Sequence, residues 1–374
     1  MQLQHRAFRN VQTGLSLIEL MIAVLVGVVL IAGVLSIFIS SRKSYGINSA
    51  VARLQDNGRF ALNFIQHDTR LAGFMGCATS ATTTSYLNPN PTGTNLAYSF
   101  GTAIQGYEYN GTAPTFTYTI AAENPSPAPA ASAGNWTPAL DGAVAGSVIP
   151  GTDVLVVRYT ESGTNPSYVT TAPAPPVATF NVSNTTGLAA RDLVIISDCT
   201  SASIFQIDAP VAGDVISHGL AAVNPGNAVA NPPNGFQLNS QISIPTTAVF
   251  YVGLGADGSP ALFRALTSTA TASGFTSTEL VSGVENMQIL YGVDTTLSQT
   301  PSEYDTAGVV TAAGTWPNVV SVRIALLLRS DTGAVTLPAA ATTSNLLGTT
   351  ITAPLDTRLR QVFVTTIGLR NSLP

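Results

Sequence analysis

The stretch TGLSLIELMIAVLVGVVLIAG, residues 13–33, sets the plan of this chain. The twenty residues from Leu20 to Ile39 carry no charged side chain, and Arg42 and Lys43 follow them. A helix of about 20 apolar residues spans the roughly 30 Å hydrocarbon core of a bilayer. We therefore expect residues 15–41 to form a helix that lies in a membrane or in the apolar core of an assembly.

Glu19 is out of place in such a segment. A carboxylate at the centre of a membrane helix costs about 2.5–3.5 kcal/mol on insertion scales, so its presence suggests a function. The small residue Gly14 precedes the apolar run, the reverse of the order in a secretory signal. Cleavage after Gly14 would place a new ammonium group on Leu15, four residues before Glu19. That cation would offset the desolvation of the carboxylate, within one helix or between neighbouring helices.

The segment GLSLIEL, residues 14–20, resembles the processing motif of type IV pilins and type II secretion pseudopilins. The resemblance implies that residues 1–14 are a leader, and that a prepilin peptidase cuts between Gly14 and Leu15 and methylates Leu15. It also implies that Glu19 helps place the subunit in a filament. Leu15 stands where phenylalanine is commoner. The alternative is a plain single-pass anchor with an unrelated glutamate.

The composition favours strands and turns for the rest of the chain. Charged residues make up 9% of the sequence, against about 25% in typical soluble proteins. The net charge is −5 and the isoelectric point is about 5.1, so the chain lacks the basic surface of a nucleic-acid-binding protein. Small, polar and β-branched residues take the place of charges, as in domains of many short strands.

Residues 42–76 change to an amphipathic pattern. Apolar or small residues recur every three or four positions, which predicts a helix with one buried face: Ile47, Val51, Leu54, Gly58, Ala61 and Ile65. We expect one helix from Leu15 to Ala72, buried in membrane or filament in its first half and packed on a globular head in its second. The turn dipeptide Asn57-Gly58 leaves room for a kink.

The head is predicted to be β-rich, so the fold class is α+β, a long N-terminal helix packed on a large antiparallel-sheet domain. Alternation in residues 318–330 predicts a half-buried strand. We expect a hairpin within 192–207 and another across Gly255–Gly258. Further strands are expected at 152–160, 283–294 and 360–371, and loops at 120–150, 163–187, 208–235 and 331–354. Residues 77–235 would form an insertion-rich β subdomain and residues 236–374 a compact β-rich core.

Two cysteines occur, Cys77 and Cys199. In an exported chain they would form a disulfide that ties the end of the helix to the head. On the chain-entropy model, a loop of this length would stabilise the fold by about 4–5 kcal/mol. The alternative is two separate buried thiols.

Several segments over most of the chain resemble the PilW group of minor pilins: residues 55–77, 196–207, 279–294, 319–330 and 360–371. The resemblance implies a minor pilin that primes type IV pilus assembly, lies at the pilus tip, and thereby serves adhesion and twitching motility. Its implied partners are the prepilin peptidase, other minor pilins, the major pilin, the inner-membrane assembly machinery and its lipid, and a tip adhesin. It would cross the inner membrane once, with a periplasmic head. A head near 300 residues would also crowd a filament shaft, which favours the tip.

No catalytic motif stands out, so we expect no enzyme activity and no cofactor. His67 lies on the amphipathic helix beside Asp68, and His218 lies in a turn-rich segment without a ligand nearby in sequence. The acidic loop at Asp294, Glu303 and Asp305 suggests calcium only weakly, because it lacks the spacing of a calcium loop.

Two rival functions stay open. The first is a J-like minor pseudopilin of a type II secretion system. The second is a membrane-anchored carbohydrate-active β-domain, which would need exposed aromatics and paired carboxylates. Trp136 and Trp316 are the only tryptophans and lie far apart in sequence.

Overall fold

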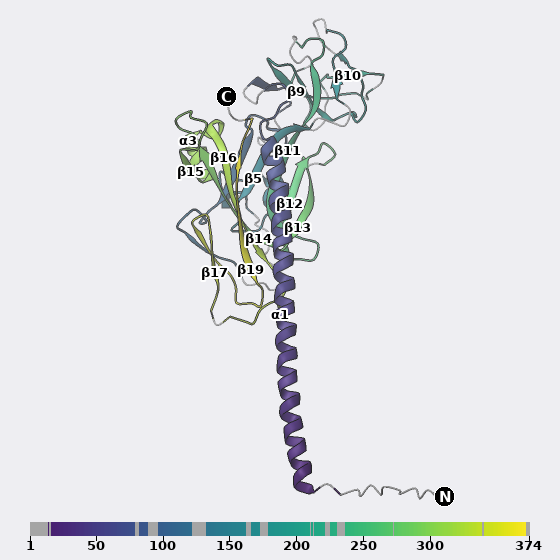
Figure 1. The fold of residues 1–374 in the computed structure, drawn as a ribbon. Helices are drawn as coiled ribbons and strands as arrows, with labels where there is room; N and C mark the ends of the chain where they lie inside the picture. The colour runs from purple at the N-terminus through teal and green to yellow at the C-terminus, as the bar shows by residue number, and fades with distance from the viewer. Residues whose placement is uncertain are drawn as a thin grey trace, which may run out of the picture.

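The computed structural model describes Gly14 and residues 16–78, 82–88, 96–121, 132–161, 166–172, 179–209, 211, 213–220, 225–229, 236–271, 273–338 and 340–371. Within these residues a single long helix projects from a β-rich head (Figure 1). The predicted α+β class is therefore confirmed.

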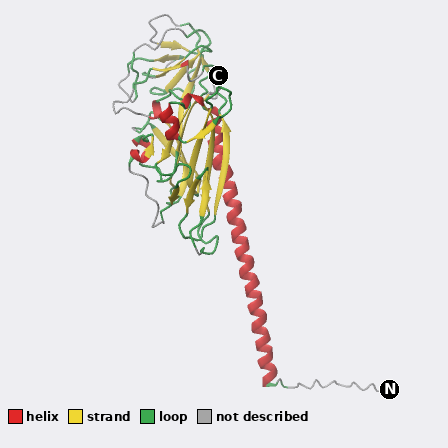
Figure 2. Ribbon diagram, turned by 90° about the vertical axis from the view of Figure 1, so that its left-hand side faces the viewer, coloured by secondary structure: helices red, strands yellow, loops and turns green. Residues whose placement is uncertain are grey.

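The long helix α1 (Leu17–Leu71) has 55 residues and is continuous. Asn57-Gly58 does not break it, although the sequence allowed a kink there. Ser16 is the N-cap residue, and its hydroxyl oxygen accepts a hydrogen bond from the Glu19 amide at 3.3 Å. The first half of α1 extends away from the head, and the second half lies against it (Figures 1 and 2).

The largest sheet runs in the order β1 (Thr83–Ser85), β9 (Ala202–Gln206), β8 (Leu193–Ser197), β11 (Gln241–Leu254), β5 (Val154–Glu161), β2 (Ile104–Tyr109) and β4 (Trp136–Thr137). Strand β11 also pairs with β6 (Ser167–Tyr168) and β12 (Pro260–Thr267), and β12 pairs with β13 (Phe275–Ser282). The hairpins β8–β9 and β11–β12 confirm the two predicted from the sequence.

A second sheet has the order β15 (Glu303–Asp305), β14 (Val284–Val293), β16 (Val319–Arg329) and β19 (Arg360–Gly368). Two small sheets complete the strands, β17 (Thr343–Leu346), β18 (Thr349–Thr352) and β3 (Thr117–Thr119) in one, and β10 (Val215–Ser217) with β7 (Thr179–Asn181) in the other. The short helices are α2 (Gly142–Ala145), α3 (Ala307–Ala313), and the single turns η2 (Leu96–Tyr98), η3 (Ala133–Asn135) and η4 (Trp316–Asn318).

The prediction of a half-buried strand at 318–330 is wrong, because β16 is buried on both faces. Ile324 and Leu326 face the main core, while Ala325 and Leu327 pack against Leu346 of β17. The sheet that covers this second face comes partly from residues 331–354, which composition marked as a loop. The other predicted loop tracts likewise contain short elements, among them β4, β7 and β10.

The main core lies between the two larger sheets and α1. It joins Leu54 and Ile65 of the helix to Leu155 of β5, Phe250 of β11 and Ile324 of β16. Strands from both sides of residue 235 thus share one sheet and one core, and the division of the head at that residue stays a prediction. A separate cluster around Phe180 and Phe205 fills the part of the head that lies furthest from the start of α1 (Figure 1).

Candidate functional site on the N-terminal helix

The candidate processing site lies directly before α1. Gly14 is exposed, with no other residue within 4 Å of the position that a side chain would occupy. Leu15 and the leader residues 1–13 lie outside the described residues. Ser16 and Glu19 have the spacing of a capping box, a sequence signal for the start of a helix that our sequence reading missed. The helix therefore begins at the first residues that would follow the predicted cut.

The first half of α1 offers an apolar surface on all sides. Its large apolar side chains from Leu17 to Ile39 are between 48% and 79% exposed. The helix is long and apolar enough to cross a membrane, and none of its most apolar window is buried inside the molecule. A contiguous apolar surface of this size is characteristic of a segment that is covered by lipid or by other protein chains.

The second half of α1 carries a narrow buried stripe. Its members are spaced by four and three residues, so they lie on one helix face: Leu54, Gly58, Ala61, Ile65 and Asp68. A β-carbon at Gly58 would stand 2.7 Å from ring atoms of Phe363 on β19. The glycine therefore permits close approach of helix and sheet, which explains why a turn-favouring dipeptide lies in an unbroken helix.

Polar contacts fix the rotation of α1 on the head. The Asn57 amide donates to the Ser282 carbonyl oxygen at 3.3 Å, and the Gln66 amide donates to the Thr365 hydroxyl at 2.7 Å. The Asp68 side chain is 1% exposed and accepts from the Arg264 guanidinium at 3.3 Å. Contacts to both sheets hold the second half of α1 in a single orientation.

His67 is an exposed residue of α1 that contacts the Asp68 carboxylate. Its ring nitrogen Nδ1 lies 2.9 Å from the second carboxylate oxygen of Asp68, and the side chain is 74% exposed. This arrangement is that of a surface histidine packed over a buried ion pair.

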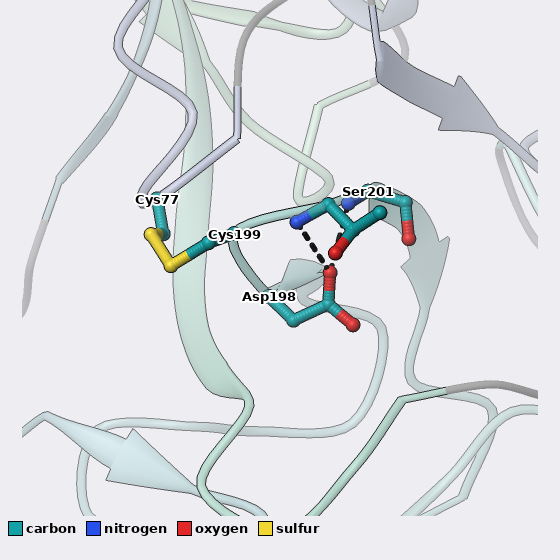
Figure 3. The surroundings of a disulfide bond; sticks show 5 residues. Cys77, Asp198, Cys199 and Ser201 are labelled. Carbon is teal, nitrogen blue, oxygen red and sulfur yellow. Dashed lines mark hydrogen bonds between the residues drawn. A yellow bond between two sulfur atoms is a disulfide. The ribbon is translucent and has the colours of Figure 1, made fainter.

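The end of α1 is tied to the distal part of the head. Gly73 donates to the Arg158 carbonyl oxygen at 2.9 Å, and Cys77 forms a disulfide with Cys199. Cys199 lies in the turn between β8 and β9, where the Asp198 carboxylate accepts from the Thr200 and Ser201 amides at 2.8 Å (Figure 3). The disulfide thus couples the helix to the hairpin that supports the distal cluster.

Two carboxyl groups share a buried position at the joint between the two larger sheets. Asp153 accepts from the Tyr109 amide at 3.0 Å and the Ile289 amide at 2.9 Å. Burial raises the pKa of Asp153 to about 7, and burial together with the Asp153 charge raises the pKa of Glu108 to about 10. The pair therefore holds at least one proton at neutral pH and acts as a structural hydrogen-bonding unit.

The remaining candidate residues from the sequence make contacts that stabilise the fold. Asp294 accepts from the Thr296 and Gln299 amides at 2.9 and 2.6 Å and so stabilises its own loop. His218 is buried against Phe180 and Phe205. Among the described residues, no three histidine, cysteine, aspartate or glutamate side chains are grouped to hold a metal ion.

The tryptophans offer little to a carbohydrate ligand. Trp136 is 2% exposed and donates its ring N–H to the Thr152 carbonyl oxygen at 2.9 Å. Trp316 packs edge-on against the buried Tyr291, with ring centroids 4.9 Å apart. Neither side chain forms an open stacking platform.

Comparison with known proteins adds one finding. A family model described as type IV pilus-assembly protein W matches residues 249–371, the segment from the middle of β11 to just past the end of β19. No curated protein and no solved structure matches the chain.

Proposed function

We propose that this chain is a minor pilin that primes assembly of the type IV pilus and lies at its tip, because residues 249–371 match the family model of type IV pilus-assembly protein W. The single observation that carries this proposal is the two-part helix. Half of α1 is apolar and uncovered, while the other half is fixed rigidly to a folded head. Such a helix can leave a bilayer and enter a bundle of similar helices without unfolding any part of the head.

Maturation follows from the start of the helix. We propose that residues 1–14 are a leader, that a prepilin peptidase cuts between Gly14 and Leu15, and that the nitrogen of Leu15 is methylated. The new cation would lie within one helical turn of Glu19, which is exposed at the start of α1. In a bundle of apolar helices, Glu19 would gain most from a cation, on its own helix or on a neighbouring one.

The location at the tip is supported by the size of the head. Seen from the side, the described head extends to one side of the line of α1 (Figure 2), which suits a position with no subunit stacked above it. We propose that the helix anchors the chain in the inner membrane with the head in the periplasm. The head would then contact other minor pilins, the major pilin and a tip adhesin. The family match favours this role over that of a J-like pseudopilin.

Processing is tested with Gly14→Val, compared with Gly27→Val, a glycine in α1 that also has no neighbour within 4 Å. We expect Gly14→Val to leave the full-length precursor in the membrane and to abolish piliation, and Gly27→Val to be processed normally. Mass spectrometry of the mature wild-type chain should find an N-methylated Leu15. A Gly14→Val protein that is still shortened and still supports pili would disprove the proposal.

A further inference from the structure

Strand β19 has an open edge. Among the described strands it pairs with β16 alone, and the Leu369 amide donates to the Val320 carbonyl oxygen at 2.9 Å. Hydrogen-bonded pairs alternate in an antiparallel ladder, so the register places the N–H and C=O groups of Val364, Thr366 and Gly368 on the side away from β16. All three residues are exposed. In the described part of the chain, the outward-facing N–H and C=O groups of these three residues make no backbone hydrogen bond.

This edge lacks the features that normally protect an edge strand, which are charge, proline, a bulge or short length. Residues 361–369 contain no charged residue and no proline, and the register with β16 has no shift. The comparable long edge, β13, has a register shift and carries Glu279, and the carbonyl group of its Ser282 is bonded to Asn57. The edge strands β1, β4 and β15 have only three, two and three residues.

Unpaired positive charges border the open edge. Arg59 and Arg70 lie seven residues before and four residues after Gln66, so they share the side of α1 that contacts β19. Arg370 follows the strand, and all three arginines are exposed. No ion pair among the described residues includes any of them. After residue 50, the described chain has one other exposed arginine without an ion pair, which is Arg191.

We propose that the edge of β19 from Val364 to Gly368 binds an extended segment of another pilin by strand addition, and that this segment carries aspartate or glutamate on the side that faces α1. Open N–H and C=O groups in alternation are satisfied by an extended backbone, not by a helix. The three arginines supply charge complementarity along the edge. The identity of the partner as a pilin rests on the proposed function, whereas the mode of binding does not.

The binding site is tested with a benzophenone amino acid placed in the full-length chain in cells. Val364 is 53% exposed on β19, and Val309 on α3, at 51%, is a matched control. We expect ultraviolet light to give a covalent adduct with another pilin from position 364 and none from position 309. Equal adducts from both positions, or none from position 364, would overturn the proposed site.

The mode of binding is tested with the probe at Thr366 and a second change, Val364→Pro against Val364→Thr. The Val364 amide does not pair with β16, so the head should keep its fold and its disulfide. We expect the proline to reduce the adduct by about tenfold or more, the effect of one lost buried hydrogen bond and a steric clash. The threonine variant should retain the adduct. An adduct unaffected by the proline would overturn strand addition.

Charge reversal tests the role of the arginines independently of the proline variant. Arg59→Glu with Arg70→Glu should reduce the adduct, and Arg191→Glu, the control, should leave it unchanged. An equal effect from both would overturn the charge complementarity. If the adduct is lost with the proline but contains a protein other than a pilin, the strand-addition site is supported and the pilin partner is refuted. The Gly14→Val variant tests the proposed function separately.

Discussion

The two halves of α1 are one regular helix with different partners. Between Leu20 and Ile39 the helix has no charged side chain and is apolar on every side, and none of its most apolar window is buried in the molecule. Between Leu54 and Leu71 a single stripe is buried and the other faces are polar or partly exposed. Backbone hydrogen bonds are satisfied equally in both, so the side chains alone decide whether a half finds its partner within the chain or outside it.

The difference separates folding from assembly. Packing of the second half contributes to the stability of the head, whereas the first half contributes only when lipid or other helices surround it. Substitutions in the second half should therefore change the free energy of unfolding of the head. Substitutions in the first half should leave it unchanged and act on membrane insertion or filament formation.

The largest effect is expected from truncating the buried stripe. Ile65 is 0% exposed, so Ile65→Ala should lower the free energy of unfolding of the head by about 2–5 kcal/mol. Leu30 is 64% exposed, so Leu30→Ala should change it by less than about 0.5 kcal/mol. Urea denaturation of the full chain in detergent micelles measures both. Equal losses would show that the first half also packs on the head.

The next effect comes from the ion pairs of the helix. Asp68 is buried, so Asp68→Ala leaves the Arg264 guanidinium, itself 27% exposed, without its partner. We expect a loss of about 3 kcal/mol. The pair of Arg53 with Asp331 has side chains 73% and 88% exposed, and Asp331→Ala should cost less than about 0.5 kcal/mol. The same denaturation assay compares them, and a large effect of Asp331→Ala would contradict this reading.

The regular parts of the molecule could be predicted from the sequence because local pattern determines them. The period of apolar residues predicts α1 as far as Ile65. The turn-forming residues at Gly255–Gly258, between two β-rich runs, predict the β11–β12 hairpin. The processing motif from Gly14 to Glu19 is likewise a short, continuous signal. Each of these inferences uses residues close together in the chain.

The remaining features depend on contacts between distant residues. Gly58 reads as a helix breaker until Phe363 is known to lie against it. Asp68 reads as a solvated helix residue until Arg264 is placed beside it. The burial of both faces of β16 depends on a sheet whose strands β17 and β18 are rich in threonine and have the composition of a loop. No single stretch of sequence contains this information.

A pH effect should appear in the head and be independent of the helix. The raised pKa values of Glu108, about 10, and Asp153, about 7, mean that the folded state binds protons that the unfolded state releases above about pH 4. The stabilisation is present at low pH and is lost as pH rises, by up to about 1.4 kcal/mol per pH unit for each group in its range. Thermal melts should therefore fall between pH 6 and 9, and Glu108→Gln should flatten the profile.

The control for this prediction is Glu19→Gln in the exposed half of the helix. It should leave the pH profile of the melts unchanged, because none of the most apolar window of α1 is buried inside the described part of the molecule. A wild-type chain whose melting temperature does not vary between pH 6 and 9 would show that the buried pair is ionised without cost.

The smallest effect is expected from replacing a glycine of α1 by alanine. The change in stability should have opposite signs at Gly58 and Gly46. Gly58→Ala places a β-carbon 2.7 Å from the Phe363 ring, and overpacking costs about 1–3 kcal/mol, offset by about 1 kcal/mol of helix propensity. Because the Phe363 ring is partly exposed and can turn, we expect a net loss of about 1 kcal/mol, restored when Phe363→Leu is added. Gly46→Ala meets no neighbour within 4 Å, so only the propensity gain remains and the helix should be stabilised slightly. Circular dichroism melts of the two variants and the double mutant measure this difference, and a stabilising Gly58→Ala would mean that helix and sheet do not need the close approach that the glycine permits.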